Sequence, residues 1–121
     1  MEYPLKCEVS VRIYAQYKCF GPGIAELLEY VDKLHSLRQA TIQMNMAYSK
    51  AWHMLKTTEV NLGFKLLSSM TGGKGGGGAT LTEKGRLFLS SYRAFEHAVR
   101  TYADDVFSAY FCKENATCSL I

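Results

Sequence analysis

Apolar and polar residues alternate along the first part of the chain, from Glu8 to Phe20. The apolar positions that share one side are Val9, Val11, Ile13, Ala15, Tyr17 and Cys19. A period of two residues predicts a half-buried strand, and the length of this run leaves room for a bend or a split. Gly21-Pro22-Gly23 follows and predicts the start of a helix, because proline is tolerated at the first helical position.

Helical spacing then replaces the alternation and predicts a first helix over 22–34. Its apolar face consists of Ile24, Leu27, Leu28, Val31 and Leu34. Ser36 and Gln39 form an S-x-x-Q capping box, which predicts a second, short helix from Ser36 onward. Asn45 lies where the chain must turn, and asparagine tolerates the left-handed backbone conformation better than most residues.

A third helix is predicted over 47–62, and its two faces differ. The side expected to pack on the core consists of Tyr48, Ala51, Trp52, Leu55 and Leu62. The opposite side consists of Met46, Ser49, Lys50, His53 and Thr57. That second face carries hydrogen-bonding and cationic groups without an acid, whereas Trp52 is interpreted as a core residue.

A glycine-rich loop separates two short segments that have strand character, 64–70 and 79–81. Six of the ten glycines lie at 72–78, around the single cation Lys74. Such a composition is also typical of a flexible linker. The position of the loop between two short strands favours the tip of a hairpin over a linker between domains.

The last helix is predicted over 82–110, with Thr82 as its N-cap. Its apolar residues recur at alternating spacings of four and three, as in a coiled-coil seam. The seam consists of Phe88, Tyr92, Phe95, Val99, Tyr102 and Val106. The helix either packs only on its own domain or joins two copies of the chain. We favour a dimer seam, because the earlier helices already supply a small core.

The composition is that of a small globular protein. A chain of 121 residues is long enough for one domain with its own core, which we place at 1–112, with a flexible tail at 113–121. The chain shows neither a membrane span nor a signal peptide, so a cytoplasmic protein without membrane contact is predicted. Its four cysteines and three histidines lack metal-ligand spacing, so we expect no metal and no cofactor.

The net charge of +3 is unevenly distributed. Residues 33–93 carry nine basic and two acidic side chains, a net charge of +7, whereas 1–32 and 94–121 each carry −2. A basic middle between acidic ends is typical of a nucleic-acid surface. An ordinary solvated face rich in lysine would have the same composition, so the order of the elements has to decide between the two.

That order is strand, helix, short helix, turn, helix, strand, return strand and helix. It predicts a mainly α protein with a small β part (α+β), namely a winged helix-turn-helix with a long C-terminal dimerisation helix. The third helix would lie in the major groove of DNA, and the glycine hairpin would be the wing. The DNA-binding residues expected from this arrangement are Arg38, Met46, Ser49, Lys50, His53, Thr57, Gly73, Lys74 and Gly75.

Several motifs in register also resemble a known family. They are TGGKGGGGA at 71–79, Leu81-Thr82, Gly85 and Tyr48-x-x-Ala51-Trp52. Together they resemble the N-terminal DNA-binding domain of the ModE family of bacterial molybdate-responsive transcriptional regulators. The similarity covers about 20–95 firmly and the first strand loosely. It implies a LysR-like winged helix-turn-helix that dimerises through its helices.

Some positions depart from the family's pattern. Ser49 stands where members usually have a lysine, Ala47 where they have serine or threonine, and Ser69 where an arginine is common. The DNA site is therefore expected to differ. Full-length members carry C-terminal molybdate-binding domains, for which this chain has no room, so we expect no direct molybdate binding.

These patterns predict a sequence-specific DNA-binding transcriptional regulator that binds a pseudo-palindromic operator as a homodimer. The alternative is a winged-helix interaction or adaptor module that heterodimerises with a full-length regulator. An enzyme is not predicted: Gly75 follows Lys74 where a P-loop has serine or threonine, and no G-x-S-x-G or H-E-x-x-H motif is present. Binding of a small anion by the backbone of the glycine loop remains a third hypothesis.

Overall fold

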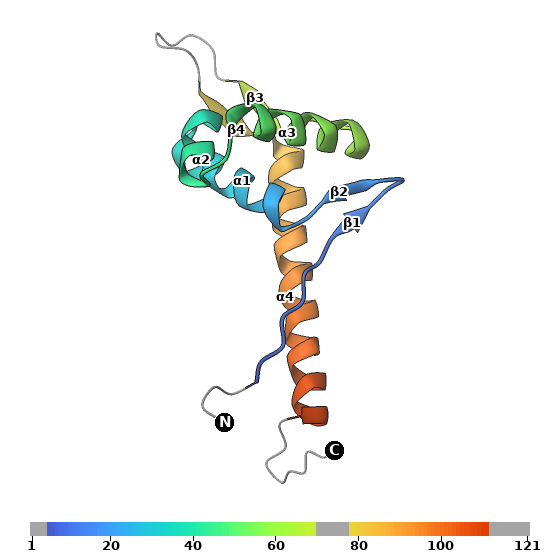
Figure 1. The fold of residues 1–121 in the computed structure, drawn as a ribbon. Coiled ribbons are helices and arrows are strands. Elements are labelled where there is room, and N and C mark those ends of the chain that lie inside the picture. Colours follow the sequence, from blue (N-terminus) through green and yellow to red (C-terminus); the bar gives the residue numbers. More distant parts are fainter. Residues whose placement is uncertain (1–4, 70–77, 112–121) are drawn as a thin grey trace. The chain divides into compact units, whose positions relative to one another are not determined.

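A computed structural model describes residues 5–69 and 78–111 of the chain. Its elements are β1 (Ile13–Tyr14), β2 (Lys18–Phe20), α1 (Pro22–Leu34), α2 (Leu37–Gln43), α3 (Tyr48–Leu62), β3 (Leu67–Ser69), β4 (Ala79–Leu81) and α4 (Glu83–Phe111) (Figure 1). The predicted fold class is confirmed: the protein is mainly α, with two small antiparallel sheets and a long C-terminal helix. No helix in the described part is both long and apolar enough to cross a membrane.

The described residues fall into two compact units, which we treat separately. One unit is formed by 11–92, and the other by the described residues of 1–10 and 93–121. The larger unit contains α1 to α3, both hairpins and the first part of α4. It therefore holds the whole helix-turn-helix.

The alternating segment before α1 is a hairpin rather than one long strand. β1 and β2 pair antiparallel, with Ile13 opposite Phe20 and an irregular register beyond that pair. The chain reverses between the strands, where the Ala15 N–H donates to the Tyr17 carbonyl at 2.9 Å. The run predicted as a single strand is thus split at its middle. Tyr17, which the alternation assigned to the buried side, is exposed at this turn.

The capping and turn signals of the helix-turn-helix are confirmed. The Gln39 N–H donates to Ser36 Oγ at 3.0 Å, as expected of an N-cap serine. Asn45 adopts a left-handed conformation, with φ of 55°, in the short turn between α2 and α3. Gly63 ends α3 with φ of 87°. In α1 the predicted apolar face is buried except for Leu34, which is exposed at the last turn.

The second hairpin is confirmed as well. β3 pairs antiparallel with β4, with Leu67 opposite Leu81 and Ser69 opposite Ala79. The two strands directly precede and follow the glycine-rich segment along the chain. Residues 70–77 lie outside the described residues, so the prediction for them stays a prediction.

A single apolar core joins these elements in the larger unit. It consists of Phe20, Ile24, Ala25, Leu27, Leu28, Val31, Ala40, Ala51, Leu55, Leu66, Leu81, Leu89 and Tyr92. The ring of Phe20 lies 4.7 Å from that of Phe88 and 5.0 Å from that of Tyr92, centroid to centroid. The Tyr92 hydroxyl donates to the Val11 carbonyl at 2.7 Å. The first part of α4 thus fastens the N-terminal hairpin and α1 into one body.

Gly85 marks the closest approach of α4 to the rest of the core. A Cβ atom at this position would lie 2.6 Å from the Leu66 carbonyl oxygen and 3.1 Å from the Leu66 Cα. The Gly85 N–H also donates to the hydroxyl oxygen of the N-cap residue, Thr82 Oγ1, at 2.9 Å. Only a residue without a side chain fits here, which explains why the position needs glycine.

We expect Gly85→Ala to destabilise the fold, because the new methyl group would collide with backbone that cannot rotate away. Overpacking of this kind costs about 1–3 kcal/mol. Urea unfolding followed by circular dichroism measures the loss. Gly23→Ala is the matched control, because nothing lies within 4 Å of a Cβ at Gly23, which is also helical. Equal stability of the two variants would contradict the packing argument.

Candidate nucleic-acid interface

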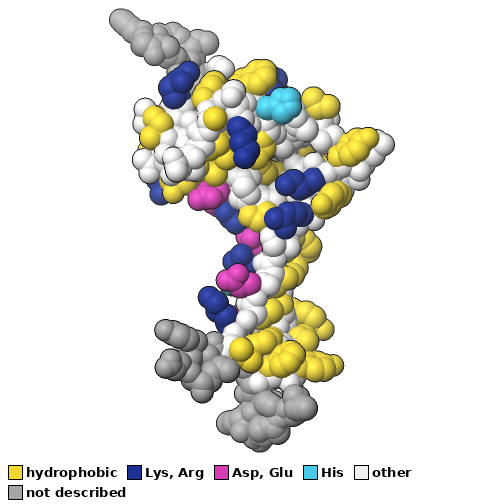
Figure 2. Space-filling view, viewed as in Figure 1, with side chains coloured by type: hydrophobic (Ala, Val, Ile, Leu, Met, Phe, Trp, Pro, Cys, Tyr) yellow, Lys and Arg dark blue, Asp and Glu magenta, His cyan; other side chains and the backbone are white. Residues whose placement is uncertain are grey.

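The outer face of α3 presents the polar residues that the sequence assigned to DNA. Ser49, Lys50, His53 and Thr57 are all exposed. Ser49, His53 and Thr57 follow one another at intervals of four, so they form a row along the helix. Figure 2 shows a histidine and several Lys or Arg side chains on the face of the molecule where α3 lies, with hydrophobic groups between them.

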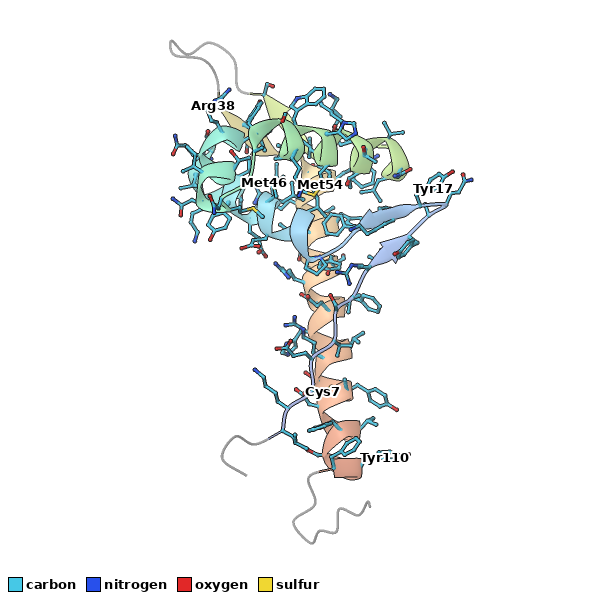
Figure 3. The ribbon with its side chains drawn as sticks, viewed as in Figure 1. Cys7, Tyr17, Arg38, Met46, Met54 and Tyr110 are labelled. Atoms are coloured by element: carbon cyan, nitrogen blue, oxygen red, sulfur yellow. The ribbon has the colours of Figure 1, made fainter. Side chains whose placement is uncertain are left out.

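Met46 does not belong to this face. Its side chain is half-buried and packs against the core, together with Met54 (Figure 3). The Met46 N–H donates to the Thr41 carbonyl at 3.0 Å, which ties the residue into the turn between α2 and α3. Met46 precedes the first residue of α3, so helical periodicity does not apply to it. The prediction that Met46 shares a face with Ser49 and His53 was therefore wrong.

Trp52 is not a core residue, so its interpretation from the sequence was wrong. Its side chain is 46% exposed, whereas Ala51 and Leu55 are buried. The Lys56 ammonium lies over the indole, 5.4 Å from the ring centroid. Trp52 stands at the edge of the buried stripe, where a large ring extends along the surface beyond the reach of the core.

A second cation lies over an aromatic ring beside the first. The Arg38 guanidinium, from α2, lies 4.4 Å from the centroid of the Tyr48 ring at the start of α3. Both Arg38 and Tyr48 are exposed. Figure 3 shows Arg38 on the edge of α2 that faces the β3–β4 hairpin. Such pairs limit the freedom of the cation while leaving its N–H groups available.

One buried carboxylate connects α3 to the second hairpin. Glu59 Oε2 accepts the Leu66 N–H at 2.7 Å and the Leu67 N–H at 3.3 Å. Its other oxygen lies 3.5 Å from the Lys56 ammonium. Because Leu67 is the first residue of β3, the carboxylate fixes the hairpin against the last turns of α3.

A groove of about 900 Å³ lies between α2, α3 and the second hairpin. Its lining residues are Ser36, Leu37, Arg38, Tyr48, Trp52, Leu55, Lys56, Lys65, Leu67, Ser68, Ser69, Gly78, Ala79 and Thr82. Three of them are cations, and no aspartate or glutamate is among the described residues that line it. The sequence analysis missed this surface except for Arg38. The spacing of Trp52 and Lys56, one helical turn apart, was the only signal of it along the chain.

Gly73, Lys74 and Gly75, the wing residues expected to contact DNA, lie outside the described residues. Their assignment stays a prediction. Within 5–69 and 78–111, no three His, Cys, Asp or Glu side chains gather as a set that would hold a metal ion.

The residues assigned to the dimer seam divide into two groups. Tyr92 is only 2% exposed and Phe88 is half-buried, and both pack on the core of their own chain. Phe95, Tyr102 and Val106 are exposed, with Tyr102 at 71%, and Val99 is half-buried. The seam therefore begins as an intramolecular contact and continues along α4 as an exposed apolar stripe.

The sequence is similar to several curated regulators. It is 31% identical over 103 residues, or 81% of this chain, to "Transcriptional regulator ModE" of Haemophilus influenzae. It is 29% identical over 89 residues, or 73% of this chain, to "DNA-binding transcriptional dual regulator ModE" of Escherichia coli K12. "Molybdenum transport protein ModE" of Azotobacter vinelandii is 33% identical over 70 residues, or 58% of this chain.

These matches confirm the resemblance to the ModE family that the motifs predicted. The chain spans 40% of the Haemophilus protein, 34% of the Escherichia protein and 26% of the Azotobacter protein. The similarity is thus to one part of longer proteins. No protein-family model matches the chain.

We expect Glu59→Ala to destabilise the protein and to loosen the second hairpin, because it removes the one carboxylate oxygen that accepts both the Leu66 and the Leu67 N–H groups. Leaving a buried donor unpaired costs about 1–3 kcal/mol. Urea unfolding measures the loss, and hydrogen exchange of the Leu66 amide reports it locally. Glu26→Ala on α1 is the matched control, since Glu26 is exposed. Unchanged hydrogen exchange of the Leu66 amide would contradict the role of Glu59 in holding the second hairpin.

Proposed function

We propose that this chain, which is similar to one part of ModE regulators over 73–81% of its own length, is a sequence-specific DNA-binding transcriptional regulator. The observation that carries the proposal is the exposed, cationic face of α3 beside an antiparallel hairpin, within a helix-turn-helix fold. The similar proteins of Haemophilus influenzae and Escherichia coli bear the names of transcriptional regulators, which supports the same function.

In the proposed complex, α3 enters the major groove, which is about 12 Å wide and admits a helix. Lys50 and the positive end of the helix dipole then meet phosphate. Ser49, His53 and Thr57 lie in a row on the same exposed face, where they would reach base edges. Phosphate contacts supply affinity and position, whereas the row supplies discrimination between sequences.

We further propose that two chains associate through α4. The exposed stripe of Phe95, Tyr102 and Val106 would lose water against the same stripe of a second copy. Two-fold symmetry would then present two α3 helices to DNA. The matching operator is a pseudo-palindrome with half-sites one or two helical turns apart, about 34–36 Å for one turn.

Binding of the chain to duplex DNA is expected to weaken steeply as salt rises, because each neutralised phosphate releases counterions. The logarithm of the association constant should fall by about 0.9 per phosphate contact for each unit in the logarithm of the salt concentration. Fluorescence anisotropy with duplexes selected from a random pool measures both affinity and half-site spacing. Undetectable binding at low salt would refute the proposed function.

Lys50→Ala should reduce DNA affinity about uniformly across sequences and lower the salt slope by about one. His53→Ala should instead change the ranking of sequences, since it removes a group near base edges. Lys33→Ala is the matched control: Lys33 is exposed on α1, away from the α3 face, and its ammonium lies 6.0 Å from the centroid of the Tyr30 ring. An equal loss with Lys33→Ala would show that net charge alone governs binding.

Tyr102→Glu is expected to shift the chain toward monomer, since it places a charge in the middle of the apolar stripe. Sedimentation equilibrium measures the shift, which should exceed tenfold in the dimer dissociation constant, or about 1.4 kcal/mol. Ser108→Glu adds the same charge to the same helix at an exposed position off the stripe and serves as control. A wild-type monomer at all concentrations would favour the adaptor alternative over the homodimer.

A further inference from the structure

A second cavity lies between α3, the β1–β2 hairpin and the start of α1, and it shares no lining residue with the groove described above. β2 runs beneath α3 before the chain enters α1 (Figure 1). The volume of the cavity is about 410 Å³, within the roughly 300–1,000 Å³ that small-molecule sites occupy. Its lining residues are Arg12, Lys18, Cys19, Phe20, Gly21, Pro22, Gly23, Ile24, Met54, Thr57 and Thr58.

The floor of this cavity is apolar. Cys19, Phe20 and Ile24 are buried, and the half-buried Met54 packs against the core beside them. Thr58 is buried as well, and its hydroxyl donates to the Met54 carbonyl at 2.9 Å, so the proton of this hydroxyl is already used within α3. An apolar group that covered this floor would remove apolar surface from water on both sides, which favours binding.

Two cations stand at the rim of the same cavity. Lys18 is the first residue of β2, Arg12 directly precedes β1, and both side chains are exposed. The stem of Arg12 lies against Gly21, since a Cβ atom at Gly21 would be 3.3 Å from Arg12 Cγ. No aspartate or glutamate is among the described residues that line the cavity. α1 begins at the same wall, and the positive end of its dipole adds to the attraction for negative charge.

We propose that this cavity binds a small organic anion with an apolar body, such as an aromatic carboxylate, and that the bound anion opposes DNA binding. The carboxylate lies at Arg12 and Lys18, and the ring covers the floor formed by Phe20, Ile24 and Met54. An inorganic anion would match the cations but would leave the apolar floor in water. A neutral aromatic molecule would cover the floor but would gain nothing from the cations.

The cavity reaches the outer row of α3 through Thr57, which lines the cavity and belongs to the row with Ser49 and His53. An anion held beside Thr57 places negative charge next to the phosphates that α3 approaches, and it offsets the charge of two cations on that surface. Both effects oppose DNA binding, because like charges repel. This effect rests on the proposed DNA-binding function, whereas binding of the anion does not. Linkage requires DNA to weaken binding of the anion by the same factor.

Benzoate is the probe for the first part of the proposal. Benzamide has the same shape without the charge, and inorganic phosphate has charge without an apolar body. Each is titrated into the isotope-labelled full chain, and binding is followed through the backbone amide resonances. We expect benzoate to shift the amides of Cys19, Gly21, Gly23 and Thr58 saturably. With two exposed cations at the rim, benzoate should bind about tenfold more tightly than benzamide.

Three results of these titrations would overturn the assignment. Equal affinities for benzoate and benzamide would show that the cations do not select an anion. Tighter binding of phosphate than of benzoate would show that the apolar floor has no part in recognition. Amide shifts confined to residues outside the cavity would show that the anion binds elsewhere.

Variants of the rim and the wall locate the ligand. Lys18→Gln should weaken benzoate by about threefold, as expected for one exposed cation, and leave benzamide unchanged. Lys33→Gln, at an exposed position outside the cavity, should change neither. Gly23→Leu should block both molecules, because Gly23 lines the cavity and a Cβ there meets nothing within 4 Å. Benzoate affinity unchanged by both Lys18→Gln and Gly23→Leu would overturn the proposal.

Fluorescence anisotropy of a labelled duplex tests the effect on DNA. Saturating benzoate should raise the DNA dissociation constant by about fivefold or more, relative to sodium chloride at the same ionic strength. In Gly23→Leu the two salts should act alike. Benzoate that binds the cavity without changing DNA affinity would overturn the regulation and leave DNA binding intact. Absence of DNA binding without benzoate would refute the proposed function and the regulation, and would leave the anion site standing.

Discussion

The carboxylate of Glu59 holds the two parts of the interface in one geometry. A helix and a two-stranded hairpin have no inherent reason to keep a fixed angle, because a hairpin this short is barely stable alone. Glu59 solves this by accepting the N–H groups of Leu66 and Leu67 just where the chain enters β3. The same side chain restrains Lys56 on the surface of α3. One buried charge therefore sets both the position of the hairpin and the position of a cation beside it.

The packing of α4 continues this constraint on the other side of the hairpin. Thr82 Oγ1 accepts the Gly85 N–H and donates to the Lys65 carbonyl, so the start of α4 is tied to the residues that Glu59 also holds. Gly85 lets the helix backbone approach Leu66 as closely as the packing requires. Leu66 is thereby fixed from two directions, by a carboxylate at its N–H and by a helix at its carbonyl.

Local signals in the sequence were sufficient for most of the fold. Ser36 with Gln39, Asn45, Gly63 and Thr82 each act on backbone within a few residues, so the boundaries they predict agree with the structure. Alternation before α1 was less informative, because a period of two continues through a tight turn whose residues are exposed, as Tyr17 is. The length of a strand and the point at which the chain reverses depend on pairing with another strand. The periodicity of a single segment does not reveal that pairing.

The residues of the candidate site also differ in whether local sequence signals could predict them. The outer row of α3 could be predicted, since helical periodicity alone places Ser49, His53 and Thr57 together. The exposure of Trp52 and Met46 could not be predicted in this way. Trp52 lies at the edge of the apolar face of α3 and Met46 lies before the helix begins, so the exposure of each depends on which neighbouring residues cover it. Lys65 joins the groove only through the turn that Glu59 stabilises. A surface made by three segments becomes visible when their packing is known, and the aromatic residue that seemed most suited to the core proves to be part of that surface.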